Sequence, residues 1–104
     1  MKVQIKTSIE QTEEREVELP AYFSAYDSVE ASWWESEIRI SADGEVYSVT
    51  KRGNGSATDT YEAEIRRHEV GRALGEYIGS DYFSPSTKEA FDAMRLAFRK
   101  MLEE

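Results

Sequence analysis

His68 is the only histidine of this 104-residue chain, which contains no cysteine. One imidazole without thiolates provides neither a structural zinc site nor a paired-histidine motif, and no disulfide can form. As a general base, His68 would need a nucleophile beside it, and no spacing in the sequence indicates one. We therefore expect a protein that is not an enzyme, with no catalytic residues, no metal and no cofactor. His68 is assigned to the surface or to a cap.

The glycines around Asn54 are the other candidate for chemistry. Gly53–Ser56 begins like a phosphate-binding loop, but the closing Gly-Lys-Ser/Thr of a P-loop is missing. Ala57 and Thr58 occupy the last two positions of a GxGxxG pattern. A strand is expected after this segment, whereas an anion site needs a helix N-terminus there. The segment is interpreted as a hairpin loop.

Charge limits the choice of partner. The chain has 13 basic and 21 acidic residues, a net charge of −8 that opposes binding to a phosphate backbone. The acids are spread along the whole chain and are densest between Asp27 and Glu45. Direct nucleic-acid binding would require a basic patch of Arg66, Arg67 and Arg72, so we expect a protein partner instead.

Aromatic and acidic side chains gather around the predicted connection between the second and third strands. This connection is expected to be a loop of about a dozen residues, long for a compact domain. Trp33 should lie on the non-core face, where either the loop covers it or it forms a binding hot spot. The predicted interaction surface consists of Tyr22, Phe23, Tyr26, Asp27, Glu30, Trp33, Glu35 and Glu37.

Two strands are predicted at the start of the chain. Apolar and polar residues alternate from Val3 to Ile9, as in a half-buried strand. Val17 and Leu19 mark a second strand that ends at Pro20. The polar stretch 11–14 is expected to be the hairpin turn between them.

A second hairpin is predicted over residues 32–52. Asp43-Gly44 favours a two-residue turn, because both residue types tolerate the positive φ of type I′. This turn would set Ile40 opposite Tyr47 and Ile38 opposite Val49. Trp34, Ile38, Ile40, Tyr47 and Val49 would then share the core face.

A fifth strand is predicted through Tyr61, Ala63 and Ile65. A five-residue loop over 53–57 keeps apolar residues in phase, with Val49 opposite Tyr61 and Tyr47 opposite Ala63. The alternative, one helix over 60–78, would be apolar on both sides.

Two helices are predicted after the strands. The first runs from about His68 to Ile78. The second begins with a capping box of Ser86 and Glu89 and carries an apolar stripe. The stripe contains Phe91, Met94, Phe98, Met101 and Leu102. We expect one α+β domain over residues 1–104, a five-stranded antiparallel meander with both C-terminal helices packed on one face.

Three glycines recur at four-residue spacing on the first predicted helix. Each interior glycine costs roughly 1 kcal/mol relative to alanine, so a close contact should offset it. Gly71, Gly75 and Gly79 are expected to allow close backbone approach to the sheet or to the last helix. The alternative is a homo-oligomer that forms through this helix face.

The stretch Glu16-Val17-Glu18-Leu19-Pro20-Ala21-Tyr22-Phe23 resembles the ELPxYF segment of small uncharacterised proteins from bacteriophages and mobile elements of gut bacteria. Those proteins similarly have an opening hairpin, a meander and a closing helix, here at Ser86 to Phe91. About ten residues match specifically, and Ala21 departs from the pattern, where an aromatic residue is common. The family has no established activity, so the resemblance assigns no functional residue. It implies a phage or prophage accessory protein.

Together these features predict a small acidic protein-interaction module, an accessory or inhibitor protein of a phage or prophage. The alternative is a small-ligand-binding domain with a pocket between the sheet and the aromatic loop, using Arg39, His68 or Arg72. No signal-peptide pattern and no membrane-length apolar run is present, so a cytoplasmic location without membrane contact is expected.

Overall fold

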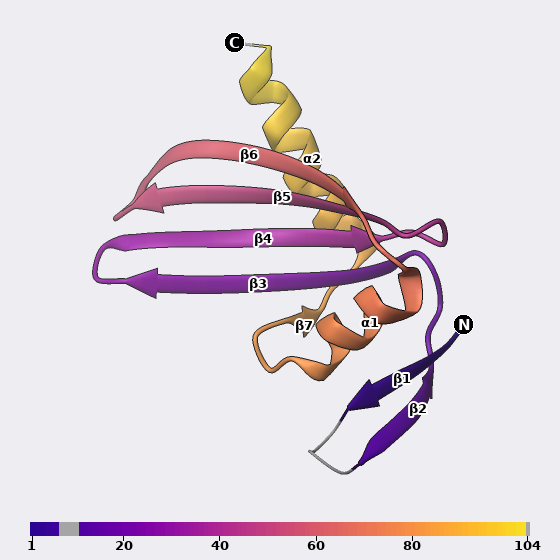
Figure 1. The fold of residues 1–104 in the computed structure, drawn as a ribbon. Helices are drawn as coiled ribbons and strands as arrows, with labels where there is room; N and C mark the ends of the chain where they lie inside the picture. Colours follow the sequence, from indigo (N-terminus) through magenta and orange to yellow (C-terminus); the bar gives the residue numbers. More distant parts are fainter. Residues whose placement is uncertain (7–10, 104) are drawn as a thin grey trace.

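The computed structural model describes residues 1–6 and 11–103, which form strands followed by helices (Figure 1). The strands are β1 (Lys2–Lys6), β2 (Thr12–Glu16), β3 (Ala21–Val29), β4 (Ser32–Ile40), β5 (Glu45–Asn54), β6 (Ala57–Arg67) and β7 (Ser84–Pro85). The helices are α1 (Val70–Gly79), before β7, and α2 (Lys88–Leu102). The α+β class, the antiparallel strands and the two C-terminal helices are confirmed.

The strands divide between two sheets rather than forming one five-stranded meander. β1 and β2 pair only with each other, with Lys2 opposite Glu16. The second sheet has the order β6-β5-β4-β3-β7, and all its pairs are antiparallel. Four consecutive strands of this sheet, β3 to β6, form the meander.

The N-terminal hairpin differs from its predicted bounds. β2 covers most of the predicted turn and ends at Glu16, whereas Val17 and Leu19 follow it. Every residue of β2 is exposed, so no alternation of apolar residues marks this strand. The part of the first predicted strand at 7–9 lies outside the described residues.

The predicted aromatic loop is wrong, because residues 21–29 form the strand β3. β3 joins β4 through a two-residue turn at Glu30 and Ala31, where Glu30 has a left-handed φ of 56°. Ala21, Phe23 and Ala25 are buried on one side of β3, while Tyr22 contacts Phe91 of α2 on the other. Residues 21–25 are buried or half-buried on both sides, so this half of the strand lacks the polar alternation that marks a half-exposed one, whereas residues 26–29 are exposed.

The register of the β4–β5 hairpin is shifted by one residue from the prediction. The strands pair with Ile40 opposite Val46 and Ile38 opposite Ser48, which leaves a three-residue loop, 42–44. The shift moves Tyr47 and Val49 to the side of the sheet opposite Ile38, so the predicted common core face is wrong.

The β5–β6 hairpin has a two-residue loop at Gly55 and Ser56, not the predicted five-residue loop. The phase change that the apolar pattern requires comes instead from a β-bulge beside Arg52 and Gly53. Val49 is therefore opposite Ala63, and Tyr47 is opposite Ile65. The fifth predicted strand is confirmed, and the helical alternative for this segment is wrong.

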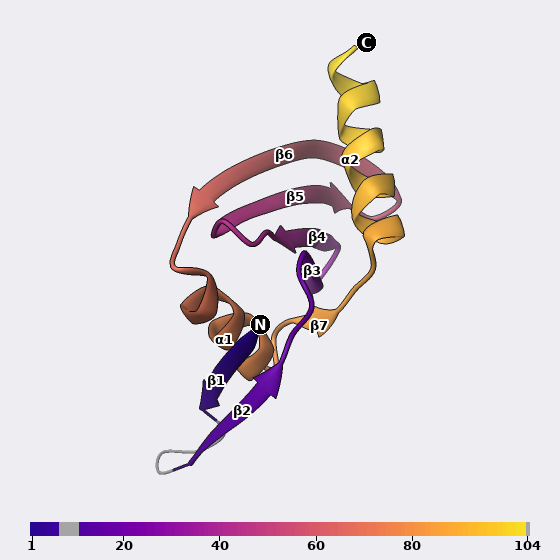
Figure 2. The same cartoon turned by 90° about the vertical axis from the view of Figure 1, so that its right-hand side faces the viewer.

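The helices lie on opposite sides of the five-stranded sheet, not on one face as predicted (Figure 2). Tyr77 of α1 contacts Phe23, with ring centroids 5.5 Å apart. Phe91 of α2 contacts Tyr22 at 5.9 Å. Because neighbouring strand residues point to opposite faces, these contacts define an α1 face, which carries Phe23, and an α2 face, which carries Tyr22.

The core lies between the α1 face, α1 and β1. Its buried members include Val3, Ile5, Phe23, Ile38, Ile40, Val46 and Leu74. The side chain of Glu69 caps α1 by accepting from the backbone N–H groups of Gly71 and Arg72. At Gly75 a Cβ atom would lie 2.9 Å from the carbonyl oxygen of Gln4, so close approach to β1 accounts for this glycine.

α2 is capped by Thr87, one residue after the predicted cap, and Thr87 Oγ1 accepts from Ala90 N at 3.1 Å. Phe91 is fully buried, while Leu96, Met101 and Leu102 are exposed. The predicted apolar stripe is therefore buried at Phe91 and exposed at Met101 and Leu102, because the helix crosses the sheet and then projects beyond β6 (Figures 1 and 2). Within the described part of the chain, no helix is long and apolar enough to cross a membrane.

Candidate functional site

The predicted interaction surface does not form one patch, because its residues lie on both faces of the sheet. Strand alternation puts Tyr22, Tyr26, Trp33, Glu35 and Glu37 on the α2 face, and Phe23 and Asp27 on the α1 face. Glu30 is in the β3–β4 turn. Phe23 belongs to the core, whereas Tyr26 is 62% exposed.

Trp33 is held by the β5–β6 hairpin. Its indole Nε1 donates to the carbonyl of Gly55 at 2.9 Å, and Lys51 Nζ lies 5.5 Å from the ring centroid. The ring covers Gly53, where a Cβ atom would come within 2.4 Å of it. Trp33 therefore fixes the end of this hairpin, and it is half-buried without a covering loop.

Glu37 accepts a hydrogen bond from the hydroxyl of Ser86, which links β4 to the segment before α2. Burial raises the pKa of the Glu37 carboxyl above its ordinary value near 4.5. The hydrogen bond from Ser86 opposes this effect, and the nearby Glu35 carboxylate adds to it. The charged form of Glu37 is thus disfavoured on folding.

The substitution Glu37→Gln is therefore expected to stabilise the protein at neutral pH. A group with a raised folded-state pKa stabilises the fold below its unfolded pKa, and that contribution is lost as pH rises through the folded value. Glutamine stays neutral and can still accept from Ser86. Thermal unfolding should show a higher Tm for the variant at pH 7 and convergence with wild type below about pH 4.

The matched control is Glu35→Gln, since Glu35 forms an ion pair with Lys51 at 3.3 Å and should not give this gain. A lower Tm for Glu37→Gln at pH 7 would contradict the prediction.

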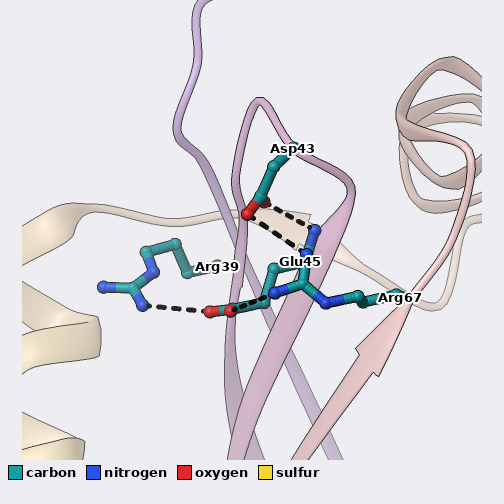
Figure 3. Close-up of polar contacts among 4 residues, drawn as sticks. All are labelled: Arg39, Asp43, Glu45 and Arg67. Carbon is teal, nitrogen blue, oxygen red and sulfur yellow. Dashed lines mark hydrogen bonds and ion pairs between the residues drawn. The ribbon is translucent and has the colours of Figure 1, made fainter.

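Four charged side chains meet at the β4–β5 loop (Figure 3). Arg67 pairs with Asp43 at 3.2 Å and with Glu45 at 3.7 Å, and Glu45 also pairs with Arg39 at 3.6 Å. The backbone N–H of Glu45 and the Arg67 side chain both lower the pKa of Asp43. This cluster connects the loop to the end of β6, and each of its two carboxylates has an arginine partner.

Arg39 lies under α2. Its guanidinium carbon is 5.0 Å from the ring centroid of Phe91 and 5.5 Å from that of Tyr47. This stacking and the ion pair with Glu45 make it a packing residue of the α2 face, not a ligand-binding group as the alternative prediction required.

A groove runs along the α1 face, beyond the end of α1. It has an inner part of about 350 Å³ and an outer part of about 420 Å³, which share Trp34 and Arg52 as lining residues. The inner part lies against Tyr77, Tyr82 and Phe83. The outer part reaches the β3–β4 turn. Together they follow β4 from Ile38 to Ser32, about 20 Å at 3.3 Å per residue.

The groove combines an aromatic wall with a polar floor. Trp34 and Tyr82 have ring centroids 5.8 Å apart, and Tyr82 contacts Phe83 edge-on at 5.3 Å. On the floor, the hydroxyls of Ser36 and Thr50 are 2.6 Å apart and hydrogen-bonded to each other.

Charged residues from β3, β5 and β6 lie along the groove. Arg52 pairs with Glu62 at 2.7 Å, and Arg66 pairs with Glu64 at 3.3 Å. Arg52, Glu64 and Arg66 line the inner part, and Asp27 lines the outer part. The groove therefore offers hydrogen-bonding and ionic partners beside an aromatic surface.

Sequence reasoning missed Tyr82 and Phe83, which follow α1 in a turn and reach Trp34 and Tyr77 only through the fold. A pocket between the sheet and aromatic side chains thus exists, but those side chains come from the segment after α1, not from residues 21–31. Of the predicted residues, Asp27 and Trp33 line its outer part.

The remaining candidates lie elsewhere. His68 is exposed between β6 and α1, and its backbone N donates to the Gly44 carbonyl at 2.9 Å. Arg72 is exposed and pairs with Glu76. Among residues 1–6 and 11–103, no three His, Asp or Glu side chains cluster so as to hold a metal ion.

Comparison with protein-family models, curated proteins and solved structures finds no match to this chain.

Proposed function

We propose that this protein is a non-enzymatic interaction module that binds an extended segment of a partner protein in the groove of the α1 face. The observation that carries the proposal is the groove itself, a trough about 20 Å long with aromatic side chains beside hydrogen-bonding groups. A length of this order suits an extended segment of about six residues better than a compact metabolite.

Trp34 and Tyr82 are the proposed anchors. Tryptophan and tyrosine dominate binding energy at interfaces, because they bury a large area and still provide a polar atom. Tyr82 is 48% exposed, so its ring is available to a partner. The proposed site therefore centres on Trp34. The predicted interaction surface contained the neighbouring residue, Trp33, whose side chain lies on the opposite face of the sheet.

The net charge of the chain favours a partner segment with basic as well as apolar side chains. Asp27 and Glu64 line the groove together with Arg52 and Arg66, so the lining itself is balanced, and the negative field comes from the chain as a whole, which carries −8. A field of this sign raises the association rate of cationic partners. Together with the resemblance of residues 16–23, this supports an accessory or inhibitor protein of a phage or prophage.

Selection from a library of short random peptides tests the proposal. Peptides enriched on the wild-type protein should bind Trp34→Ala and Tyr82→Ala about tenfold or more weakly, the scale of a hot-spot truncation. Tyr26→Ala is the matched control, since it removes an exposed aromatic ring from the α2 face. Tm values establish that each variant is folded.

Peptides that bind all three variants as tightly as wild type would place the binding surface elsewhere and overturn the proposal. Failure to enrich any peptide would do the same.

Small-ligand binding is the second candidate function, and the inner part of the groove favours it. Its volume of about 350 Å³ is within the range of known ligand sites, and it combines the Ser36–Thr50 hydroxyl pair with the side chains of four aromatic residues. Thermal stabilisation by a small molecule, lost in Tyr82→Ala, would support this candidate over peptide binding.

A further inference from the structure

The five-stranded sheet has two edges that differ in kind. One is β7, two residues long and ending in Pro85, which has no N–H to donate to a further strand. The other is β6, an eleven-residue strand with no other strand of the described chain beside its outer edge. A long strand edge presents a row of N–H and C=O groups that can pair with another chain.

From this edge and the charges on it, we infer that β6 pairs antiparallel with β6 of a second copy of the chain, joining two sheets about a two-fold axis. An antiparallel strand pair is self-complementary, as a two-fold interface requires. This edge borders the groove, since Glu64 and Arg66 also line its inner part, but the inference concerns the backbone edge of β6 and does not depend on the proposed function.

Among the registers centred on residues 63 to 66 of β6, the side chains favour one. Pairing centred on Glu64 or Arg66 would set that residue against its own copy, and pairing centred on Ala63 would set Glu62 against Glu64. Pairing centred on Ile65 instead sets Ile65 against Ile65 and places each Glu64 opposite the Arg66 of the second copy. Opposite charges directly across a strand pair are favourable, and like charges are unfavourable.

The side chains in this register are exposed, and Glu64 and Arg66 pair with each other within one copy. Ile65 is 58% exposed, and the side chains of Glu64 and Arg66 are 61% and 51% exposed. Both charged residues lie on the α1 face, since they pair with Ser48 and Val46 of β5, whereas Ile65 lies on the α2 face opposite Tyr47.

α2 adds apolar surface on the side of Ile65. The helix projects beyond β6, as both views show, and three apolar residues in its second half are exposed (Figures 1 and 2). They are Leu96 at 53%, Met101 at 37% and Leu102 at 66%. An added strand would extend the sheet beneath this overhang and cover part of that surface.

Charge reversal tests the pairing through the dimer dissociation constant, measured by analytical ultracentrifugation. Glu64→Arg and Arg66→Glu each set like charges opposite one another at both symmetric positions, so each should weaken the dimer about tenfold or more. The double variant, and an equimolar mixture of the two single variants, restore opposite charges and should recover association. Recovery in the mixture distinguishes pairing from a folding defect.

Single cysteines test the register, since the chain has none of its own. Ile65→Cys should form an intermolecular disulfide on oxidation, because residue 65 lies opposite its own copy. Ala63→Cys is the control. In this register residue 63 lies opposite residue 67 of the second copy, so the two cysteines at 63 are four residues apart along the strand, about 13 Å and too far for a disulfide.

A monomeric wild-type protein, equal crosslinking at 63 and 65, or a dimer insensitive to the charge reversals would overturn the inference. Capture of a strand from a different protein by β6 without self-association would likewise overturn it.

Discussion

Phe91→Ala is expected to lower the free energy of unfolding by about 3–5 kcal/mol, as do other truncations of fully buried phenylalanine. Phe91 joins α2 to the sheet, with its ring 5.9 Å from that of Tyr22 and 5.5 Å from that of Tyr47. It also covers the guanidinium of Arg39, whose buried Nε has no hydrogen-bond partner among the described residues. Truncation would leave a cavity and would remove the ring that covers the Arg39 guanidinium. Urea denaturation measures the resulting decrease in the free energy of unfolding.

The matched control is Leu102→Ala on the same helix. Leu102 is 66% exposed, so a monomer with this change should stay within about 0.5 kcal/mol of wild type. A loss below about 1 kcal/mol for Phe91→Ala would mean that α2 is not docked through this residue.

Gly44→Ala is expected to be the most damaging replacement of a glycine by alanine. Gly44 has a φ of +87°, and a Cβ atom there would lie 2.0 Å from the carbonyl oxygen of His68. The two segments are also joined by the hydrogen bond from His68 N to Gly44 O. Alanine therefore combines backbone strain with displacement of the β6–α1 junction, and we expect a loss of about 3 kcal/mol or more.

Gly55→Ala separates these two causes. Gly55 also has a positive φ, +60°, but a Cβ atom there would meet nothing within 4 Å beyond its chain neighbours. Only the conformational cost of about 1 kcal/mol should therefore appear. Equal losses at the two positions in urea denaturation would show that contact with His68 adds nothing.

Local patterns in the sequence predicted most elements, because alternation and helical spacing depend on neighbouring residues alone. β6 was found through Tyr61, Ala63 and Ile65, and α2 through the spacing of Phe91, Met94 and Phe98. β3 was missed because residues 21–25 are packed on both sides in the fold and residues 26–29 are exposed, so neither half of the strand gives an alternating apolar and polar signal.

The register of the β4–β5 hairpin could not be predicted from neighbouring residues. The length of its loop explains why the two helices were predicted on one face of the sheet. A two-residue turn at Asp43-Gly44 would have put Tyr47 and Val49 beside Ile38 and Ile40 on one apolar face. The three-residue loop puts them on the other face, so each face needs its own cover. α1 covers one face and α2 covers the other.

The candidate site depended on contacts between distant parts of the chain. Trp34 and Tyr82 are far apart in sequence, and nothing local indicates that their rings meet. Trp33 was correctly placed away from the core of Ile38 and Ile40, but its contacts with Gly53 and Gly55 required the bulged end of the β5–β6 hairpin.

The adjacent indoles of Trp33 and Trp34 provide the protein with two built-in optical reporters. They are its only tryptophans and lie on opposite faces of one strand. Trp34 lines both parts of the groove, whereas Trp33 lies against the β5–β6 hairpin and lines only the outer part. Keeping one and replacing the other with phenylalanine confines the tryptophan emission to a single residue. Emission from Trp34 then reports on the inner part of the groove, and emission from Trp33 reports on the β5–β6 hairpin and the outer part, without an attached dye.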